Sequence, residues 1–437
     1  MVAARAVLLR LHRWAGLAMA AFLVMAGLTG SVIAFQGELD AWLNPDLYRA
    51  RTAGTAPSPE MVSPGTLAPG TLAPGTLSPG TLAQRFAQQD PRAEIRYVAF
   101  RVPPGQSVPA FVQPRTDPAT GKPYALDYDE VFLDPASGDV LGRREWGACC
   151  LSARHLVPFV YRLHSTLAAG PAGTVFMGCV AVLWALDCFA GLVLTWPRGR
   201  PFLAKWRPAW RLKRGAGGYR LTLDLHRATG LWLWLMLLLM AISGVALTLE
   251  DQVFRPVLGL VADLSPSPFV AFANRHPDPA RTRIGYDRAV AIAAAESRRR
   301  GWGYRPGGLF DVRSAGVYAV YFFDRPTERG AGFGRPIVYL DDSGGTVLRV
   351  DDPGRGRTGD TILALQFPLH SGQVAGLAGR IAVALLGIGV AVLSVTGVLI
   401  WARKRRARRL ALRSAALHTG RIDGTTIRVP RPIRTHE

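Results

Sequence analysis

The chain has 437 residues, of which 49% are apolar and 19% are charged, and its formal net charge is +21. This composition is too apolar for an ordinary soluble enzyme of this size. A large positive charge would suit a nucleic-acid partner, but no RNA- or DNA-binding motif is present and the arginines cluster beside apolar runs, as in membrane proteins. The four cysteines contain no CxxC pair, which argues against a disulfide framework and a zinc site.

Four segments are long enough to cross a bilayer as helices, because a span requires about 20 apolar residues. Their apolar runs cover residues 15–35, 172–196, 228–249 and 381–401. Only the second run contains a charged residue, Asp187, whereas helices of soluble cores seldom stay uncharged over this length. We therefore expect an α-helical membrane protein with a bundle of four transmembrane helices.

The N-terminal residues 1–14 are short and basic, and together with the first span, residues 15–37, they could be read as a secretory signal. The apolar run is longer than a usual signal core, and its sequence returns later in the chain. We therefore interpret it as a retained helix with its N-terminus in the cytoplasm.

Residues 38–163 are expected to form a first α+β domain outside the membrane. Four Pro-Gly-Thr-Leu units make residues 63–82 a linker, because proline and glycine at this density build neither a helix nor a core. A short helix is expected from Leu82. Residues 131–141 predict a strand, a turn and a second strand, with Asp-Pro and Ser-Gly in the turn.

An outer segment that begins with His164 continues into the second helix, and together they cover residues 164–197. The loop at residues 198–225 carries eight lysine and arginine residues and no acidic residue before Asp224, which marks the cytoplasmic side. The third helix, residues 226–250, leads out of the cytoplasm again.

Residues 251–369 are expected to form a second outer α+β domain, with a helix at residues 287–299 and another strand-turn-strand unit at residues 337–348. An outer segment and the fourth helix, residues 370–402, lead back to a basic tail. The tail, residues 403–437, is expected to be disordered. Both termini are therefore expected in the cytoplasm, and the charge bias agrees at every crossing.

The two halves of the chain repeat each other in the same orientation, as in a parallel repeat. The sequence Leu-His-Arg at residues 11–13 returns at residues 225–227. The sequence Leu-His-Ser at residues 163–165 returns at residues 369–371. Each copy lies beside a long apolar run, so the repeat predicts helix, outer domain and helix, twice.

The expected topology pairs one histidine from each half at each membrane face: His12 with His226 inside, and His164 with His370 outside. An imidazole beside hydrocarbon needs a partner, and two imidazoles that face each other in a helix bundle make a six-coordinate haem site. We expect two haems, one for each pair. Interfacial histidines bonded to backbone, or copper or zinc, are the alternatives, although two histidines are too few for a closed zinc site.

Glycines recur at the other end of the histidine helices. Gly30 lies about five helical turns, roughly 27 Å, from His12 on the same helix face, and Gly244 has the same relation to His226. Glycine at these positions would let a flat macrocycle approach the backbone, so both are candidate cofactor-binding residues. Close packing between helices without a cofactor explains the glycines equally well.

Arginines follow both inner histidines. Arg13 and Arg227 are expected either to pair with haem propionates or to act as ordinary cytoplasmic anchors. His155 lies nine residues before His164 and competes with it as the outer ligand.

Three other residues are candidates for chemistry. Asp187 is the one carboxylate inside a span, where it would relay protons, contact a quinol or simply bond to a neighbouring hydroxyl. Cys149 and Cys150 are expected outside, in an oxidising compartment. They would form a strained disulfide, bind substrate metal or remain an ordinary pair of thiols.

The Leu-His-Arg motif with its following glycine, the repeated Leu-His-Ser motif and the strand-turn-strand units resemble those of PepSY-associated transmembrane proteins, over roughly residues 5–405. The resemblance implies two periplasmic PepSY-like domains and a place in the inner membrane of Gram-negative bacteria. It also implies two b haems, on His12, His164, His226 and His370, and a reductase that acts on ferric siderophores. Unlike flavin-fused relatives, the chain has no GxGxxG motif after a strand, so the electron donor is an unknown cytoplasmic partner or a quinol.

The expected mechanism takes an electron from the inner haem to the outer haem and on to a ferric complex held by the outer domains. Reduction weakens the hold of an oxygen-donor chelator on iron, which is then released. Two other functions are compatible with parts of the pattern. The outer domains would bind a peptide or regulate a protease, with the helices as an anchor, or the repeat would form a permease. The shortage of polar residues in the spans counts against the permease.

Overall fold

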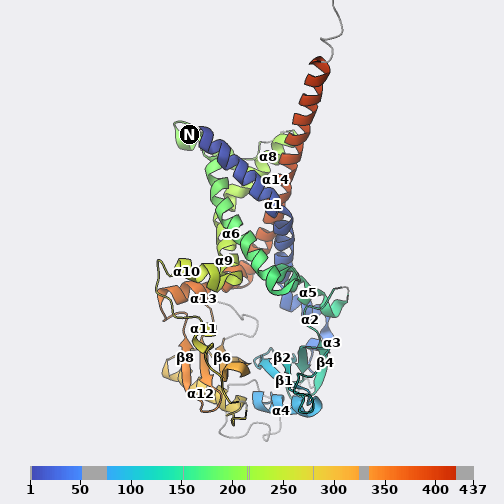
Figure 1. The fold of residues 1–437 in the computed structure, drawn as a ribbon, viewed down its shortest axis with the longest axis vertical. Helices are drawn as coiled ribbons and strands as arrows, with labels where there is room; N and C mark the ends of the chain where they lie inside the picture. The colour runs from blue at the N-terminus through green and yellow to red at the C-terminus, as the bar shows by residue number, and fades with distance from the viewer. Residues whose placement is uncertain are drawn as a thin grey trace, which may run out of the picture. The chain divides into compact units, whose positions relative to one another are not determined.

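A computed structural model describes residues 2–51, 76–150, 152–213, 215, 217–278, 280–323 and 334–419 of the chain (Figure 1). The chain divides into two compact units. Unit 1 consists of Met1–Val24, Asp187–Trp234 and Val390–Glu437, and unit 2 consists of Met25–Leu186 and Leu235–Gly389. Several long helices therefore contribute one end to unit 1 and the other end to unit 2.

Within the described residues, three helices are long and apolar enough to cross a membrane: α1 (Val2–Ile33), α6 (Gly170–Thr195) and α14 (Gly376–Thr419). The helices α8 (Gly218–Trp232) and α9 (Trp234–Thr248) make a fourth candidate if this bent pair counts as one span. Only 11–22% of the apolar window of each long helix is buried inside the protein. Most of these apolar side chains are therefore at least partly exposed on the protein surface, as they are in helices surrounded by lipid.

The third expected span, residues 226–250, is not one straight helix. It begins earlier, at Gly218, and it bends by 68° at the break between α8 and α9. Just after the break, the indole of Trp234 donates a hydrogen bond to the carbonyl of Cys188 at 2.9 Å and packs against Phe189, with ring centroids 5.9 Å apart. These contacts with α6 fix the position of the start of α9. A hydropathy pattern does not contain such contacts, so it could not predict the bend.

The basic tail that was expected to be disordered is partly helical. The last helix, α14, continues as far as Thr419. Arginine, lysine, alanine and leucine dominate this stretch, and all four are strong helix formers. Residues 420–437 lie outside the described residues.

The expected linker at residues 63–82 also ends in a helix. Helix α4 (Pro79–Gln89) begins inside it. The hydroxyl of Ser78 accepts a hydrogen bond from the backbone N–H of Thr81 at 3.1 Å, and Pro79 occupies the first helical turn. A serine cap followed by proline starts a helix well, so the last Pro-Gly-Thr-Leu unit is helical. Residues 63–75 lie outside the described part of the chain.

Unit 2 contains an eight-stranded antiparallel sheet in the order β4-β3-β2-β1-β5-β6-β7-β8. The strands are β1 (Ala93–Val98), β2 (Val108–Pro114), β3 (Glu130–Leu133), β4 (Val140–Arg144), β5 (Pro306–Val312), β6 (Val317–Phe322), β7 (Ile337–Asp341) and β8 (Val347–Asp351). Both predicted strand-turn-strand units are confirmed as β3–β4 and β7–β8. In each turn an aspartate, Asp134 or Asp341, accepts hydrogen bonds from the backbone of the turn.

The two outer domains expected from the sequence are joined in this single sheet. Strands β1 and β5, the first strands of the two halves, pair with Tyr97 opposite Phe310 and Val98 opposite Leu309. The pairing satisfies two strand edges that separate domains would leave open, which is the physical reason for the difference.

Helices α4 and α12 (Tyr286–Arg299) pack together and against the sheet. The helix predicted at residues 287–299 is confirmed as α12. Phe86 of α4 and Val290 of α12 are fully buried in one apolar core with strands from both halves. The carboxylate of Asp287 also accepts a hydrogen bond from the backbone N–H of Gly80 at 2.8 Å, which ties the two halves together.

Two short helices connect the sheet to the long apolar helices. Helix α5 (Ala153–Thr166) follows β4 and precedes α6, and α13 (Thr358–His370) follows β8 and precedes α14. Shorter helices of the described residues are α2 (Gln36–Leu43), α3 (Pro45–Tyr48), α7 (Phe202–Trp206), α10 (Arg255–Leu258) and α11 (Pro268–Phe272). The order of helix, four strands, short helix and long helix therefore occurs twice, as the sequence repeat predicts.

A buried arginine anchors α5 to the sheet. Arg144, at the end of β4, forms ion pairs with Asp40 of α2 at 2.7 Å and with Glu130 of β3 at 2.5 Å. Its guanidinium also donates to the carbonyl of Arg154 in α5 at 3.0 Å. The side chain of Arg144 is only 1% exposed, so this network is part of the core that holds α5 in place.

Candidate functional site

The structure brings together the two histidines predicted at the inner face. In unit 1, the ring centroids of His12 on α1 and His226 on α8 lie 6.2 Å apart, with the ring planes tilted by 58°. The two residues come from opposite halves of the chain and from helices that hydropathy selects as membrane helices. Their proximity is what the sequence repeat predicts for a site shared by both halves.

The two histidines predicted at the outer face form a second pair. In unit 2, the ring centroids of His164 and His370 lie 6.1 Å apart, at an angle of 62°. His164 lies in α5, and His370 is the last residue of α13. The outer pair is therefore carried by the short helices next to the sheet, not by the apolar helices themselves.

The inner histidines are oriented through their Nδ1 atoms. Nδ1 of His12 lies 2.9 Å from a carboxylate oxygen of Asp187 on α6. Nδ1 of His226 lies 3.0 Å from the carbonyl oxygen of Leu393 and 3.1 Å from the hydroxyl of Thr396, both on α14. A carboxylate or a carbonyl only accepts, so each Nδ1 atom carries the proton and donates it.

The outer histidines are oriented in the same way. Nδ1 of His164 lies 3.0 Å from the hydroxyl of Thr29 on α1, and Nδ1 of His370 lies 2.9 Å from the hydroxyl of Ser243 on α9. All four histidines make these hydrogen bonds through Nδ1 and not through Nε2. A metal-binding histidine commonly has this arrangement, with one nitrogen held by the protein and the other left for the metal.

A glycine of a neighbouring helix packs against each imidazole. A Cβ atom added at Gly30 would lie 3.0 Å from Cε1 of His164, and one added at Gly244 would lie 3.9 Å from Cε1 of His370. Gly30 and Gly244, predicted to admit a macrocycle, thus contact the outer histidines. The inner histidines have the same contact, at 3.5 Å for Gly191 with His12 and 3.3 Å for Gly397 with His226.

We call each such glycine, with the Nδ1 acceptor beside it, a histidine seat. Three seats have a hydroxyl residue immediately before the glycine: Thr29-Gly30, Ser243-Gly244 and Thr396-Gly397. These hydroxyl residues, and the contacts of Gly191 and Gly397 with the inner histidines, were not among the residues predicted from the sequence. The repeated Ser/Thr-Gly dipeptide in three of the four apolar helices is the signal that would have found them.

The arginines that follow the inner histidines have unsatisfied atoms. The Nε atoms of Arg13 and Arg227 are buried and have no hydrogen-bond partner among the described residues. The Nη2 atom of Arg227 donates to Asp224 at 3.1 Å and to the carbonyl of Pro208 at 3.0 Å. A buried N–H group without a partner is costly, so these two equivalent atoms indicate a missing acceptor at the same place in each half.

These observations fit a haem. Two metal–imidazole bonds of about 2 Å, extended by the ring from nitrogen to centroid, bring the ring centres about 6 Å apart, which agrees with both pairs. The orphaned Nε atoms of Arg13 and Arg227 suit the carboxylate of a propionate. Within the described residues, no group of three or more His, Cys, Asp and Glu side chains is arranged to hold a metal ion. Each histidine pair therefore offers a metal two imidazole ligands and, among these residues, no third protein ligand.

The other candidates lie elsewhere or have ordinary contacts. His155 is nine residues from His164 on the same helix, and its Nδ1 atom bonds to the hydroxyl of Ser152 at 3.2 Å. His164, not His155, is the residue beside His370. Cys149 and Cys150 are joined by a disulfide between adjacent residues, so neither is an ordinary free thiol.

A cavity of about 830 Å³ in unit 2 is lined in part by residues that are close in sequence to His370 and to Gly244. Phe367 and Pro368 of α13, just before His370, line it together with Ala246 and Leu247 of α9, just after Gly244. Its other walls contain six arginines and four carboxylates: Arg255, Arg300, Arg335, Arg349, Arg355, Arg357, Glu250, Asp351, Asp352 and Asp360. The charge lining this cavity is therefore positive.

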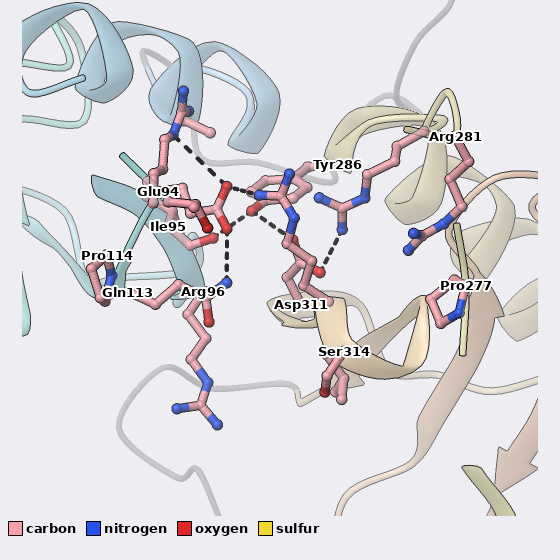
Figure 2. Close-up of a pocket in the computed structure, with 16 residues that line it drawn as sticks. Glu94, Ile95, Arg96, Gln113, Pro114, Pro277, Arg281, Tyr286, Asp311 and Ser314 are labelled. Atoms are coloured by element: carbon pink, nitrogen blue, oxygen red, sulfur yellow. Dashed lines mark hydrogen bonds and ion pairs between the residues drawn. The ribbon is translucent and has the colours of Figure 1, made fainter. Parts of the chain in front are cut away.

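A larger cavity, of about 1030 Å³, lies where the two halves of the sheet meet. Figure 2 shows Glu94 and Ile95 of β1 on one side and Tyr286 and Asp311 of the second half on the other. The hydroxyl of Tyr286 donates to the carbonyl of Ile95 across it. Four of the arginines that line this cavity are paired with carboxylates, such as Arg283 with Asp311, so their charge is largely neutralised.

The chain matches the model of one protein family, described as the PepSY-associated TM region, over residues 9–404. No curated protein matches the chain. The family match covers most of the sequence, including both histidine pairs and the sheet, and it makes the chain a membrane protein. The chain belongs to the PepSY-associated TM region family.

Proposed function

We propose that this protein is a multi-pass electron-transfer protein of the bacterial inner membrane that holds two b haems and reduces ferric siderophores in the periplasm. The observation that carries the proposal is the pairing of four repeated histidines, with ring centroids 6.2 Å and 6.1 Å apart. In this proposal the four apolar helices, with α8 and α9 as one span, form the bundle around the pairs.

Each group has a defined role in the proposal. His12 and His226 hold one haem and His164 and His370 hold the other, while Arg13 and Arg227 pair with propionates of the inner group. When bound, haem supplies one-electron transfer between its ferric and ferrous states. The protein holds each imidazole in the tautomer with the proton on Nδ1, so that Nε2 remains the ligand atom.

The charge pattern supports an orientation. The loop at residues 198–213, next to the inner pair in the chain, and the start of the tail at residues 403–409 are strongly basic. Positive loops stay in the cytoplasm, so the inner pair lies toward the cytoplasm and the sheet lies in the periplasm. The electron enters from a cytoplasmic donor or a quinol and leaves on the periplasmic side.

The arginine-lined cavity that includes Phe367 and Pro368 in its wall supports an anionic ferric chelate as the acceptor. Arg355 and Arg357 are exposed in its wall and donate to the backbone carbonyls of Arg300 and Leu264, with no carboxylate partner among the described residues. Their charge is therefore available to a ligand. One electron converts the bound Fe³⁺ to Fe²⁺, for which hard oxygen donors have a lower affinity, and the iron is released.

The acceptor step is tested with the purified full chain, reduced with dithionite and desalted without oxygen. A ferric trihydroxamate chelate is added together with a ferrous-iron indicator. The proposal predicts that the protein is reoxidised and that one ferrous ion appears for each electron lost. Replacement of both Arg355 and Arg357 by glutamate should slow this step, whereas Arg298→Glu, outside the cavity, should not. A reduced protein that stays reduced would contradict the proposal.

A further inference from the structure

The four histidine seats are not equivalent. Three of them offer Nδ1 a neutral hydroxyl or carbonyl oxygen, from Thr29, Ser243 or the pair Leu393 and Thr396. The seat of His12 has alanine, Ala190, in place of the hydroxyl residue before Gly191. Its acceptor is instead the carboxylate of Asp187, one helical turn before the glycine.

The position of Asp187 is unusual for a carboxylate. It is the one acidic residue in the four apolar runs, and its side chain is only 10% exposed. Within the described residues, the side chain of His12 is its one hydrogen-bond and ion-pair partner. A buried carboxylate in a membrane helix is costly. Because three other seats hold their histidines with neutral groups, holding the ring does not by itself account for a carboxylate.

We propose that Asp187 makes His12 the strongest electron-donating imidazole of the four, and so gives the inner site the lower reduction potential. The inference rests on the proposed function, because it assumes that His12 and His226 hold a haem. A carboxylate that accepts the Nδ1 proton increases the basicity of the ligand nitrogen, and a ligand of higher basicity favours the ferric state. The negative charge of Asp187 favours the ferric state in the same direction.

The difference in reduction potential between the two sites sets the direction of electron transfer. An electron moves spontaneously from the site of lower potential to the site of higher potential. With Asp187 at the inner pair and neutral acceptors at the outer pair, transfer from the cytoplasmic side toward the periplasm is favoured. Asp187 would thus act as a positioning residue that works through His12, without contact with a substrate.

The internal repeat supplies the variant that tests this. On α14 the corresponding positions are Leu393, Thr396 and Gly397, so the double variant Asp187→Leu with Ala190→Thr gives His12 the seat that His226 has. Asp187→Asn keeps an acceptor and removes the charge. Glu38→Gln, which removes an exposed carboxylate outside both pairs, is the matched control.

The measurement is a potentiometric titration of the purified full chain, followed by the haem absorption bands and by the low-spin EPR signals. In both Asp187 variants we expect one of the two transitions to shift to a higher potential, with a change in one EPR signal, while the other transition and the haem count stay as in the wild type. Glu38→Gln should shift neither. Unchanged potentials with two haems, or loss of the inner haem in both Asp187 variants, would overturn the inference and leave the proposed function intact. A wild-type protein without haem would overturn the proposed function instead.

Discussion

The imidazole rings of His164 and His370 lie 6.1 Å apart. His164 belongs to α5 in the first half of the chain, and His370 is the last residue of α13 in the second half. Both helices leave the same eight-stranded sheet. The outer pair therefore depends on the pairing of β1 with β5 and on the contacts that anchor α5. Substitutions at the outer site therefore test both the ligands and the contacts that hold α5 and α13 in place.

Replacement of His164 by alanine should remove one haem from the chain, because it removes one of the two ligands of the outer pair. His155→Ala is the matched control on the same helix, since its ring bonds to Ser152 and does not lie beside His370. A pyridine haemochrome assay on purified variants measures the count. Loss of haem in His155→Ala but not in His164→Ala would show that the ligand is misassigned.

Leucine in place of Gly30 should displace the ring of His164, because a Cβ atom there would already lie 3.0 Å from Cε1. The expected result is a loss of about one haem per chain, or a weaker and broader outer-site EPR signal. Gly37→Leu on α2 provides the comparison, as nothing lies within 4 Å of its added Cβ. Equal effects of the two substitutions would argue against the seat.

Methionine in place of Arg144 should destabilise unit 2 by about 3–5 kcal/mol, because it leaves the buried carboxylates of Asp40 and Glu130 without their partner. Arg154→Met removes a pair with Asp46 whose side chains are 37% and 61% exposed, and should cost about 0–1 kcal/mol. Urea titration of the full chain in detergent, read by pulse proteolysis, separates the two. A small effect at Arg144 would contradict its anchoring role.

The sheet should lose stability in acid partly through Asp90. The guanidinium of Arg92, followed by the hydroxyl of Tyr128, holds the pKa of the Asp90 carboxyl well below its usual range, against the opposing effect of burial. The folded state then binds fewer protons than the unfolded state, so this stability is present above about pH 4 and is lost as the pH falls further.

Asparagine at Asp90 should therefore make unfolding less dependent on pH below about pH 4, at the expense of lower stability at neutral pH. Circular dichroism of the full chain, titrated with acid in detergent, measures both effects. Asp139→Asn, which removes an exposed carboxylate bonded to Ser137, is the control. An Asp90 variant with the wild-type acid profile would show that the arginine pair does not contribute.

Much of the site could be predicted because the chain repeats itself. Hydropathy located the apolar helices, and the repeated histidines identified partners that are distant in sequence. The turns were predictable because Asp134 and Asp341 bind backbone N–H groups locally. These features depend on neighbours in the sequence or on a pattern that occurs twice.

The features that escaped prediction depend on contacts between distant segments. The joining of the halves rests on the pairing of Tyr97 with Phe310, and neither strand carries a local sign of its partner. The break before α9 lies next to Trp234, which contacts α6, a helix that is distant in the sequence. The contact of Gly30 with His164 follows only when α1 and α5 are in place, so the role of the glycine could not be read from α1 alone.

The most direct test of the central claim is a reduced-minus-oxidised absorption spectrum of the purified full chain, combined with a haem count per polypeptide. We expect the spectrum of b-type haem with two haems per chain, one for each histidine pair. A colourless protein would contradict it, and would leave a membrane-anchored binding or regulatory role for the sheet as the better explanation.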